Sequence, residues 1–446
     1  MSNPNPTVAP WLSNSRWSTA PIRRVARLGT GHTPSRNVPE YWEKCTTPWI
    51  TLADVWQLRD GTTSVISETK EKISRLGMAN SSAVKHPAGT VILSRTASVG
   101  FSGIMGTDMA TSQDFATWKC GPDLDPSFLL HALRAMRPDL QRLAAGSTHK
   151  TIYMPDIEQL RIPVPPLEEQ HRIANFLDTE TARIDRMVRA REAQITGLEE
   201  RSFAAVTEAL IPAALESPLG TFPHPWLPEL PVDAPMTRLG YVCRLQNGIT
   251  VDENRPPTAN DVTRPYLRVA NVQAGHVALD SVTEITVPRH MARRSTLRIG
   301  DVLMTEGGDL DKLGRGTVWR GELAGCLHQN HVFALRPDPE KLDADYLALM
   351  TQTLHGRCYF ESTGTKTTNL ASTNSSKILS FAIPLPSVER QRELVQEVHA
   401  QQAANQRMKH SLTRQVALLA ERRQTLITAA VTGQIDVTTA RGVDAV

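Results

Sequence analysis

Residues 162–170 read IPVPPLEEQ, and this stretch decides how the chain is organised. Its prolines interrupt whatever strand or helix precedes them, and Pro166 suits the first position of a helix because its missing N–H would have no partner there. Glu168 and Glu169 favour the positive end of a helix dipole. Beyond them, apolar residues recur at helical spacing up to Pro212: Ile173, Leu177, Ile184, Val188, Ile195, Leu198, Val206 and Leu210. The stretch therefore predicts one long helix.

A second proline break predicts a second long helix. Residues 383–386 read IPLP, Ser387 is a suitable N-cap, and Gly433 is a suitable C-cap. Between these caps, one stripe position holds Val398, Asn405, Leu412, Leu419 and Leu426, and a second holds Leu394, Gln401, Met408, Gln415 and Arg422. About 40 helical residues span roughly 60 Å. Such a stripe packs either on its own globular unit or on the other helix, and its length favours an antiparallel coiled coil.

Other segments repeat in the same order. Residues 10–12 (PWL) recur at 225–227, and 204–207 (AAVT) recur at 429–432. Arg27-Leu28 followed by Gly31 recurs as Arg244-Leu245 followed by Gly248. Several matches in order, at nearly constant separation, indicate a tandem duplication.

Each copy begins with short β-like segments broken by Gly, Pro and Asn. The sequence thus predicts a mixed α+β (α/β) chain with pseudo-twofold repeats. The predicted parts are a globular domain over 1–165, a helix over 166–215, a second globular domain over 216–385, a helix over 386–434, and a tail over 435–446.

The composition indicates an ordinary globular protein. The chain has 446 residues, of which 40% are hydrophobic and 21% charged, and it shows no apolar run of membrane-spanning length. Residues 1–17 lack the pattern of a signal peptide. The five cysteines are scattered without a CxxC pair, which argues against disulfides or a zinc-thiolate site and predicts a cytoplasmic location. A net charge of +3 neither requires nor excludes a nucleic-acid partner.

Several motifs together resemble the specificity subunit of type I restriction-modification systems. In the first half they are GHTP at 31–34, YW at 41–42, PWI at 48–50 and the break at 162–170; in the second they are YLRVANV at 266–272, IPLP at 383–386 and LITAAVTG at 426–433. The pattern departs at Glu389-Arg390-Gln391, where the family has Glu-Gln, and the second half lacks the Tyr-Trp and Pro-Trp pairs.

The resemblance implies a function in DNA recognition. Each globular domain would be a target-recognition domain that reads half of a bipartite site on double-stranded DNA. The helices would set the spacing and dock two methyltransferase subunits, which in turn recruit restriction subunits. S-adenosylmethionine, ATP and Mg would then be held by the partners, with no cofactor on this chain and no membrane association.

No catalytic motif stands out in the sequence. It contains no GxxxxGK[ST] phosphate loop, and Gly29-Thr30-Gly31 lacks the third glycine of a dinucleotide or methyl-donor site. An Asn-Pro-Pro-aromatic motif for amino methylation is absent. His328 and His331 have helical ligand spacing but no third ligand close in sequence. The sequence therefore predicts a non-catalytic subunit with no metal site.

Arg, Lys, Gln and Asn on loops between the β-like segments suit contacts with base edges and phosphates. Arginine suits guanine and phosphate, and Gln or Asn suits adenine. The predicted DNA-binding residues are Arg36, Arg95, Ser98, Gln113, His149 and Lys150 in the first unit, and Arg255, Arg268, Asn271, Arg315, Gln329, Asn330 and Lys366 in the second. The predicted partner-binding residues on the helices are Gln170, Ile173, Leu177, Ile184, Gln391, Leu394, Val398 and Leu412.

Two other functions fit parts of the pattern. The chain could be a helical scaffold that does not touch DNA, which the long apolar stripes alone would suit. It could also be the specificity module of a self-contained modification enzyme, although no residues are left over for catalytic domains. Negligible DNA binding would favour the former, and methyl transfer by the chain alone would favour the latter.

Overall fold

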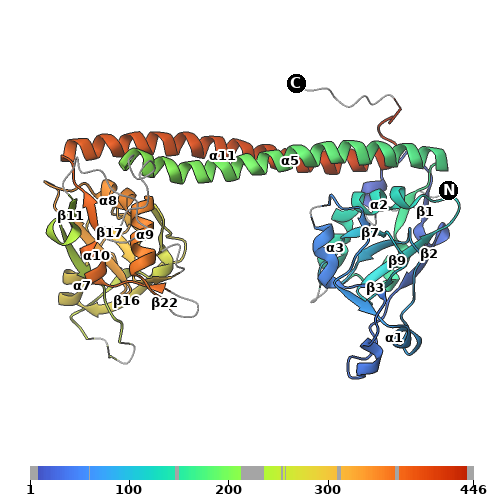
Figure 1. The fold of residues 1–446 in the computed structure, drawn as a ribbon, viewed down its shortest axis with the longest axis horizontal. Coiled ribbons are helices and arrows are strands. Elements are labelled where there is room, and N and C mark those ends of the chain that lie inside the picture. Colours follow the sequence, from blue (N-terminus) through green and yellow to red (C-terminus); the bar gives the residue numbers. More distant parts are fainter. Residues whose placement is uncertain are drawn as a thin grey trace. The chain divides into compact units, whose positions relative to one another are not determined.

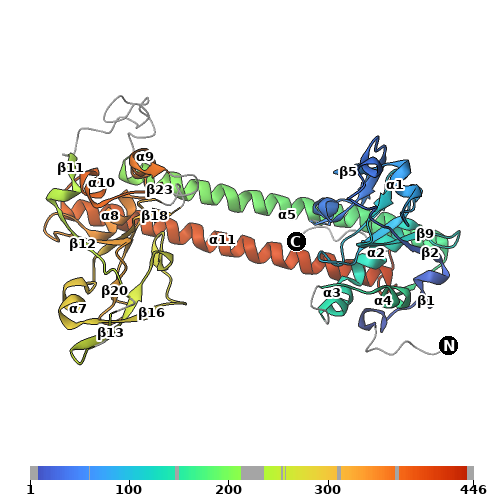
Figure 2. The same ribbon diagram turned by 90° about the horizontal axis from the view of Figure 1, so that it is seen from below.

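The computed structural model describes residues 9–59, 61–145, 150–211, 236–252, 255–256, 258–308, 313–366 and 371–438. Contacts group the chain into two compact units, which we call unit 1 (Met1–Ala193 with Leu412–Val446) and unit 2 (Gln194–Ser411). Each unit contains a globular part and a segment of both long helices (Figures 1 and 2).

Two sheets build the globular part of unit 1. The larger has the strand order β2-β9-β6-β7-β4 and the smaller β5-β3-β8, while β1 and β10 form a separate antiparallel pair directly before the proline break. The strands are β1 (Thr19–Pro21), β2 (Ala26–Thr30), β3 (Thr47–Ile50), β4 (Val65–Ile66), β5 (Glu71–Ile73), β6 (Val91–Ser94), β7 (Ser102–Met105), β8 (Ala110–Thr111), β9 (Phe115–Cys120) and β10 (Arg161–Pro163).

Helix α2 closes the main core of unit 1. It starts at the N-cap Asp125, whose carboxylate accepts a hydrogen bond from the Phe128 N–H at 2.8 Å, and it packs on β6 and β7 through Phe128 and Leu133. The short helices of unit 1 are α1 (Arg75–Ala79), α2 (Pro126–Ala135), α3 (Arg137–Ala145), α4 (Met154–Gln159) and the 3-10 helices η1 (Pro10–Leu12), η2 (Ile22–Arg24), η3 (Pro39–Trp42) and η4 (Leu52–Leu58).

Unit 2 is built on sheets of order β12-β21-β17-β19 and β16-β13-β20, with the smaller sheets β11-β24, β14-β15 and β18-β23-β22. The strands are β11 (Met236–Arg238), β12 (Cys243–Asn247), β13 (Asp261–Leu267), β14 (Val272–Gln273), β15 (His276–Val277), β16 (Thr283–Pro288), β17 (Val302–Thr305), β18 (Gly307–Gly308), β19 (Gly316–Val318), β20 (Leu327–His328), β21 (Val332–Pro337), β22 (Thr365–Lys366), β23 (Ala371–Ser372) and β24 (Ala382–Pro384). The short helices are η5 (Leu239–Tyr241), η6 (Val269–Asn271), α7 (Arg289–Ser295), α8 (Ala344–Met350), α9 (Leu354–Thr363) and α10 (Ser375–Ser380).

The duplication extends from sequence to topology. The three-stranded sheets β5-β3-β8 of unit 1 and β16-β13-β20 of unit 2 have the same strand directions. The middle strand pairs in parallel with one neighbour (β3 with β8, β13 with β20) and antiparallel with the other (β3 with β5, β13 with β16). Trp49 lies opposite Ala110, as Tyr266 lies opposite Leu327. The second half therefore does have a counterpart of Pro48-Trp49-Ile50, namely Pro265-Tyr266-Leu267. The sequence comparison missed it because the aromatic residue differs.

The long helices α5 (Leu167–Leu210) and α11 (Val388–Val431) each have 44 residues. In unit 2 the Asn405 amide donates to the Ser202 hydroxyl at 2.9 Å and Glu199 pairs with Lys409, so the helix segments run antiparallel. In unit 1 Asp185 pairs with Arg423 at 3.0 Å. The helices also pack on the globular parts, because Ile173 and Leu177 join the core of unit 1, and Leu394 and Val398 that of unit 2. The long helices therefore pack both on each other and on the globular parts.

The ends of α11 agree with the predicted caps. The Ser387 hydroxyl accepts a hydrogen bond from the Arg390 N–H at 3.3 Å. At the other end, Gly433 has φ +70°, and the Gln434 N–H donates to the Ala429 carbonyl at 2.8 Å, which is a Schellman motif. Helix α5 follows Pro166 directly. Pro212 and the repeat at 225–227 lie outside the described residues.

One of the two predicted stripe positions on α11 is confirmed at Leu394, which is buried, and is wrong at the four stripe residues that follow it. Gln401, Met408, Gln415 and Arg422 are exposed, and Met408 is 56% exposed. The inward positions lie one residue later, at Gln402, Lys409, Val416 and Arg423, which are half-buried. Both sets lie within one helical turn of the Val398 position, and only the partner surface decides which of them turns inward. No helix in the described ranges is long and apolar enough to span a membrane.

Candidate nucleic-acid interface

A glycine at the end of the first long strand brings two loops together in each unit. A Cβ on Gly31 would lie 1.8 Å from the Thr111 carbonyl oxygen, and a Cβ on Gly248 would lie 2.1 Å from the Gln329 carbonyl oxygen. Only glycine allows so close a backbone approach. The crossing places Thr33, whose hydroxyl donates to the Gln113 side-chain oxygen at 2.7 Å, beside the loop after β8. In unit 2 it places the end of β12 beside the loop after β20.

The predicted residues of unit 1 separate into two kinds. Arg95 is held by carbonyls, since its Nε donates to Gln113 O at 3.0 Å and another guanidinium nitrogen donates to Ile152 O at 3.3 Å. Ser98 is half-buried, and its carbonyl accepts a hydrogen bond from the Ser94 hydroxyl. By contrast, Gln113 and Lys150 are exposed, and Lys150 has φ +44°. His149 lies outside the described residues.

Arg36 forms an aromatic and ionic cluster with its neighbours. Its guanidinium lies 3.9 Å from the centre of the Trp42 ring and 2.6 Å from a Glu71 carboxylate oxygen. Trp42 packs against the buried Trp49 with ring centres 5.2 Å apart. The cation–π contact and the ion pair hold Arg36 in place, although its side chain remains 54% exposed. The buried Trp49 therefore serves packing, and Trp42 packs against it.

In unit 2 the structure corrects two predicted DNA contacts. Asn271 is only 2% exposed. Its side-chain oxygen accepts from the Arg268 N–H at 2.8 Å and its amide donates to the Ala278 carbonyl at 2.9 Å, so it fixes a turn. Arg255 binds both carboxylate oxygens of Asp261 at 2.7 Å, which neutralises its charge. Neither side chain faces outward as a free donor.

The remaining predicted residues of unit 2 lie at or near the surface. Arg268 is exposed, whereas Arg315, Gln329 and Asn330 are half-buried. Gln329 and Asn330 form the loop that crosses β12, with the Asn330 N–H donating to the Ile249 carbonyl at 3.1 Å. Lys366 lies in β22, and its side chain lies outside the described part of the chain.

All eight predicted partner-binding residues are buried within the chain itself. Gln170 and Gln391 are fully buried, and the six apolar residues are at most 8% exposed. Gln170 accepts from Asp125 N and donates to Asp123 O and Pro165 O at 2.8–2.9 Å. Gln391 makes the same three contacts with Asp343 N, Lys341 O and Pro386 O. These side chains join each helix to its globular part, so they cannot form an outer docking surface.

Burial favours the neutral form of one histidine and two cysteines in unit 2. Burial lowers the pKa of His328, whose Nδ1 contacts the Val332 carbonyl at 2.6 Å. Burial raises the pKa of the Cys243 and Cys326 thiols to about 12, so neither is a thiolate. His331 contacts Glu306 at 2.5 Å instead of joining His328, and the described residues contain no cluster of three or more metal-ligating side chains.

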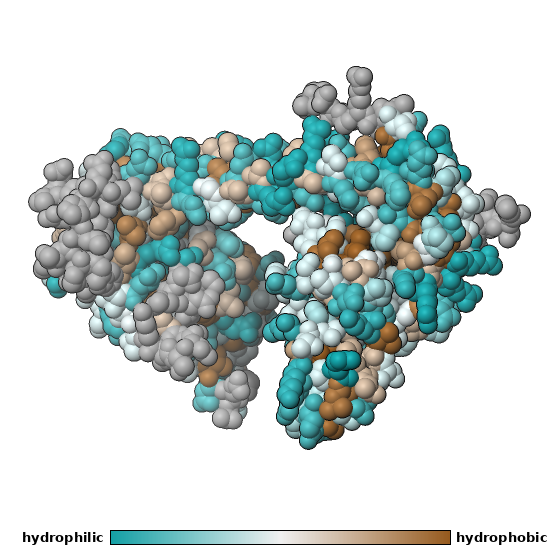
Figure 3. Space-filling model, turned by 45° about the vertical axis from the view of Figure 1, so that its right-hand side comes forward, coloured by the Kyte–Doolittle hydropathy of each residue, from teal (hydrophilic) through white to brown (hydrophobic). Residues whose placement is uncertain are grey.

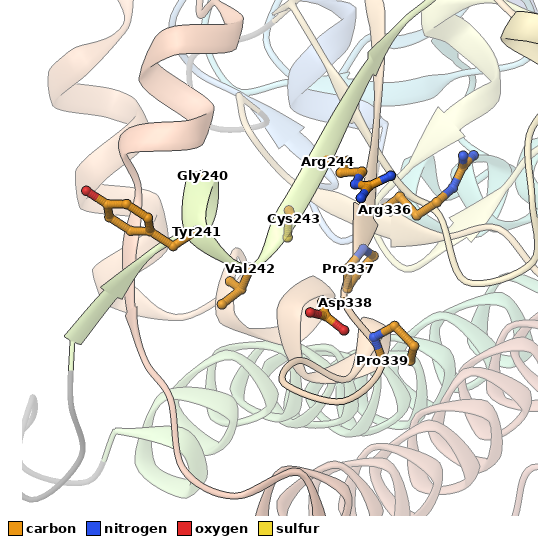
Figure 4. A pocket seen from close by; sticks show the side chains of 9 residues that line it. All are labelled: Gly240, Tyr241, Val242, Cys243, Arg244, Arg336, Pro337, Asp338 and Pro339. Atoms are coloured by element: carbon orange, nitrogen blue, oxygen red, sulfur yellow. The ribbon is translucent and has the colours of Figure 1, made fainter.

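Sequence reasoning missed a basic surface in unit 2. Helix α7 reads RHMARRS, and its arginines Arg289, Arg293 and Arg294 are exposed. A groove runs between α7 and β12. A neighbouring pocket shares Arg244 and Arg336 with the groove; in Figure 4 these side chains extend to the same side, while Tyr241 points away. The sequence signal for this basic surface is the presence of three arginines within the six residues 289–294.

The chain is similar to proteins of known families. The profile of the type I restriction modification DNA specificity domain matches residues 14–196. The type I restriction enzyme EcoKI specificity subunit of Escherichia coli (strain K12) is 26% identical over 278 residues, which are 61% of this chain. The chain aligns with 57% of the length of that relative.

Solved structures resemble the whole fold. A chain from a study of complex assembly and conformational transition of the type I R-M system has a TM-score of 0.71 at 20% identity, covering 94% of this chain and 98% of that one. The HsdS subunit from Thermoanaerobacter tengcongensis has a TM-score of 0.54 at 19% identity, with 94% and 97% covered. At such identities the likeness concerns the fold.

Proposed function

We propose that the chain is a type I restriction-modification specificity subunit, because residues 14–196 match the DNA specificity domain of that family. It would recognise a DNA sequence in two halves and catalyse no reaction itself. One observation carries the proposal: the same pair of crossing loops is built twice, around Gly31 and Gly248, on two copies of one topology. Residues 1–165 and 216–385 would be the two target-recognition domains. Gln113 in unit 1 and the Gln329–Asn330 loop in unit 2 offer amides suited to base edges.

The long helices supply the second part of the proposal. Exposed side chains on α5 and α11, rather than their buried stripes, would dock two methyltransferase subunits, and restriction subunits would join through them. S-adenosylmethionine, ATP and Mg would act on those partners. We place the assembly in the cytoplasm, together with its DNA. The duplicated fold supports this stoichiometry, because two similar units offer two similar docking sites.

The test is a selection from randomised duplex DNA with the full chain and its methyltransferase partner. We expect enrichment of a bipartite sequence, with two short defined parts separated by an undefined spacer. If no sequence is enriched, the proposal is wrong. Unchanged partner assembly with negligible DNA binding would favour a scaffold, and methyl transfer by the purified chain alone would favour a self-contained enzyme.

A further inference from the structure

Helix α7 is anchored so that its arginines face outward. Ala292 and Ser295 are buried, and Ala292 packs with Tyr266, Val287 and Leu327 in a small core on the sheet β16-β13-β20. Arg289, Arg293 and Arg294 are exposed, and none of them forms an ion pair with any residue that the structure describes. Figure 1 shows α7 on the side of the globular part of unit 2 away from α11. An unneutralised basic surface of this kind suits a polyanion.

The groove beside α7 combines charge with hydrogen-bonding capacity. Its lining includes Arg294 on one wall and Arg244, Asn247 and Thr250 on the other. Arg336 also lines it, but both carboxylate oxygens of Asp301 accept hydrogen bonds from its guanidinium at 2.7 Å. The exposed amide of Asn247 has no hydrogen-bond partner in the described ranges. An unpaired amide beside an unpaired guanidinium matches the edges of adenine and guanine.

We infer that α7 and this groove form the DNA contact of unit 2, with Arg289 and Arg293 on phosphates and Asn247 and Arg294 on base edges. The inference rests on the proposed function and adds which residues contact phosphates and which contact base edges. Arg289 and Arg293 lie four residues apart on one helix face, so they are placed to follow a strand of the backbone. Asn247 ends β12 immediately before Gly248, so the close approach of Gly248 to the Gln329 carbonyl fixes its position.

The equivalent element of unit 1 differs in chemistry. Helix α1 follows β5 as α7 follows β16, and Met78 packs beside Trp49 and Ile73 on the smaller sheet. Its exposed residues include one arginine, Arg75, and Leu76, which is 50% exposed. Figure 3 shows hydrophobic among hydrophilic surface at the end of unit 1 away from the helices. Helix α1 therefore offers fewer cationic side chains for phosphate contacts than α7.

Salt titrations of DNA binding by the full complex test the phosphate contacts. The logarithm of affinity falls with the logarithm of salt concentration by about 0.9 for each phosphate contact. The double variant Arg289→Gln with Arg293→Gln should therefore reduce the slope by about 1.8 and weaken all sequences alike. Arg320→Gln is the matched control, because Arg320 is exposed but paired with Asp345, and its slope should stay unchanged.

Selection of bound sequences tests the base contacts. Asn247→Ala should relax preference about tenfold at a position in one half of the site and leave the salt slope unchanged. Gln113→Ala in unit 1 should affect only the other half. Unfolding midpoints equal to that of the unaltered chain would show that the variants are folded.

Two results would overturn the inference while leaving the proposed function intact. One is an unchanged salt slope in the arginine double variant, and the other is unchanged base preference in Asn247→Ala, each with wild-type bipartite binding. If the unaltered complex binds no defined sequence, the proposed function fails and this inference fails with it.

Discussion

Two buried glutamines occupy matching positions near the start of α5 and α11. Gln170 and Gln391 each satisfy one N–H and two carbonyls that belong to the segment before α2 or α8 and to the proline break. Glutamine has the acceptor and the two donor hydrogens that this arrangement needs. The side chain therefore acts as a joint between helix and globular part, which explains why the same residue type stands at both sites.

Replacing Gln170 by alanine should destabilise unit 1. The change leaves three buried polar groups without partners, and we expect a loss of about 3 kcal/mol in the free energy of unfolding. Urea titration measures it, and Gln391→Ala should behave alike in unit 2. Gln401→Ala on the exposed face of α11 is the control and should change little. A loss below about 0.5 kcal/mol at Gln170 would contradict this role.

Buried histidines should make stability depend on pH. Burial lowers the pKa of His328 and His355 below the ordinary value of 6.5. Between the lowered pKa and 6.5 the unfolded chain binds more protons than the folded one, so stability falls as pH drops through 6.5. Above 6.5 both states are neutral at these groups, and their contribution is constant. Unfolding midpoints measured from pH 8 to 5 check this, and His355→Asn should flatten the decline below pH 6.5.

At the scale of elements, local chemistry sets the ends of the long helices. Ser387 caps the start of α11, and Gly433 ends it in the left-handed region with φ +70°. The same end is also shaped by tertiary contact, because a Cβ on Gly433 would lie 2.4 Å from the Trp17 indole nitrogen. The terminus of α11 is thereby joined to the N-terminal part of unit 1.

A glycine-to-alanine change just after α11 and one within α5 should have opposite effects. Gly433→Ala should cost about 1–2 kcal/mol, because a side chain is strained at positive φ and collides with Trp17. Gly197→Ala should instead stabilise the chain by about 0.5–1 kcal/mol, since Gly197 lies within α5 with open space around it. Thermal unfolding measures both changes. A shift in the same direction for both would show that Gly433 has no special conformational role.

At the scale of the whole molecule, one topology is used twice with different contacts. In unit 1 Arg423 joins both helices to the globular part: it pairs with Asp185 of α5, and its NH2 donates to the Gly61 carbonyl at 2.6 Å. In unit 2 the helix contacts are Ser202 with Asn405 and Glu199 with Lys409. Duplicated units can thus keep their fold while their polar contacts diverge.

Arg423→Met should destabilise unit 1 by about 3 kcal/mol. Both partners are largely buried, with side-chain exposures of 18% and 11%, so the change leaves the Asp185 carboxylate without its partner. Adding Asp185→Leu should recover most of the loss, because the unpaired charge is then gone. Urea titrations of the two single variants and the double variant form the cycle that checks this. Independent, additive losses would contradict a direct coupling between the two side chains.

Elements that form for local reasons can be predicted from the amino-acid sequence. Apolar spacing, the prolines at 163–166 and the caps at Ser387 and Gly433 specified two long helices, and the ordered repeats specified a duplicated mixed fold. Each of these signals lies within one helical turn or one short segment. It can therefore be recognised in the sequence without knowledge of the residues that pack against it.

The exposure of the polar side chains, by contrast, depends on contacts between segments that are far apart in the sequence. Gln170 and Asp123 are joined across 47 residues, and Gly31 approaches Thr111 across 80 residues. The sequence does not distinguish an asparagine whose partner is a buried carbonyl from one that is free to bind DNA, so it predicts Asn271 as a DNA contact although this side chain is buried. Burial, which results from the packing of distant segments, separates the two.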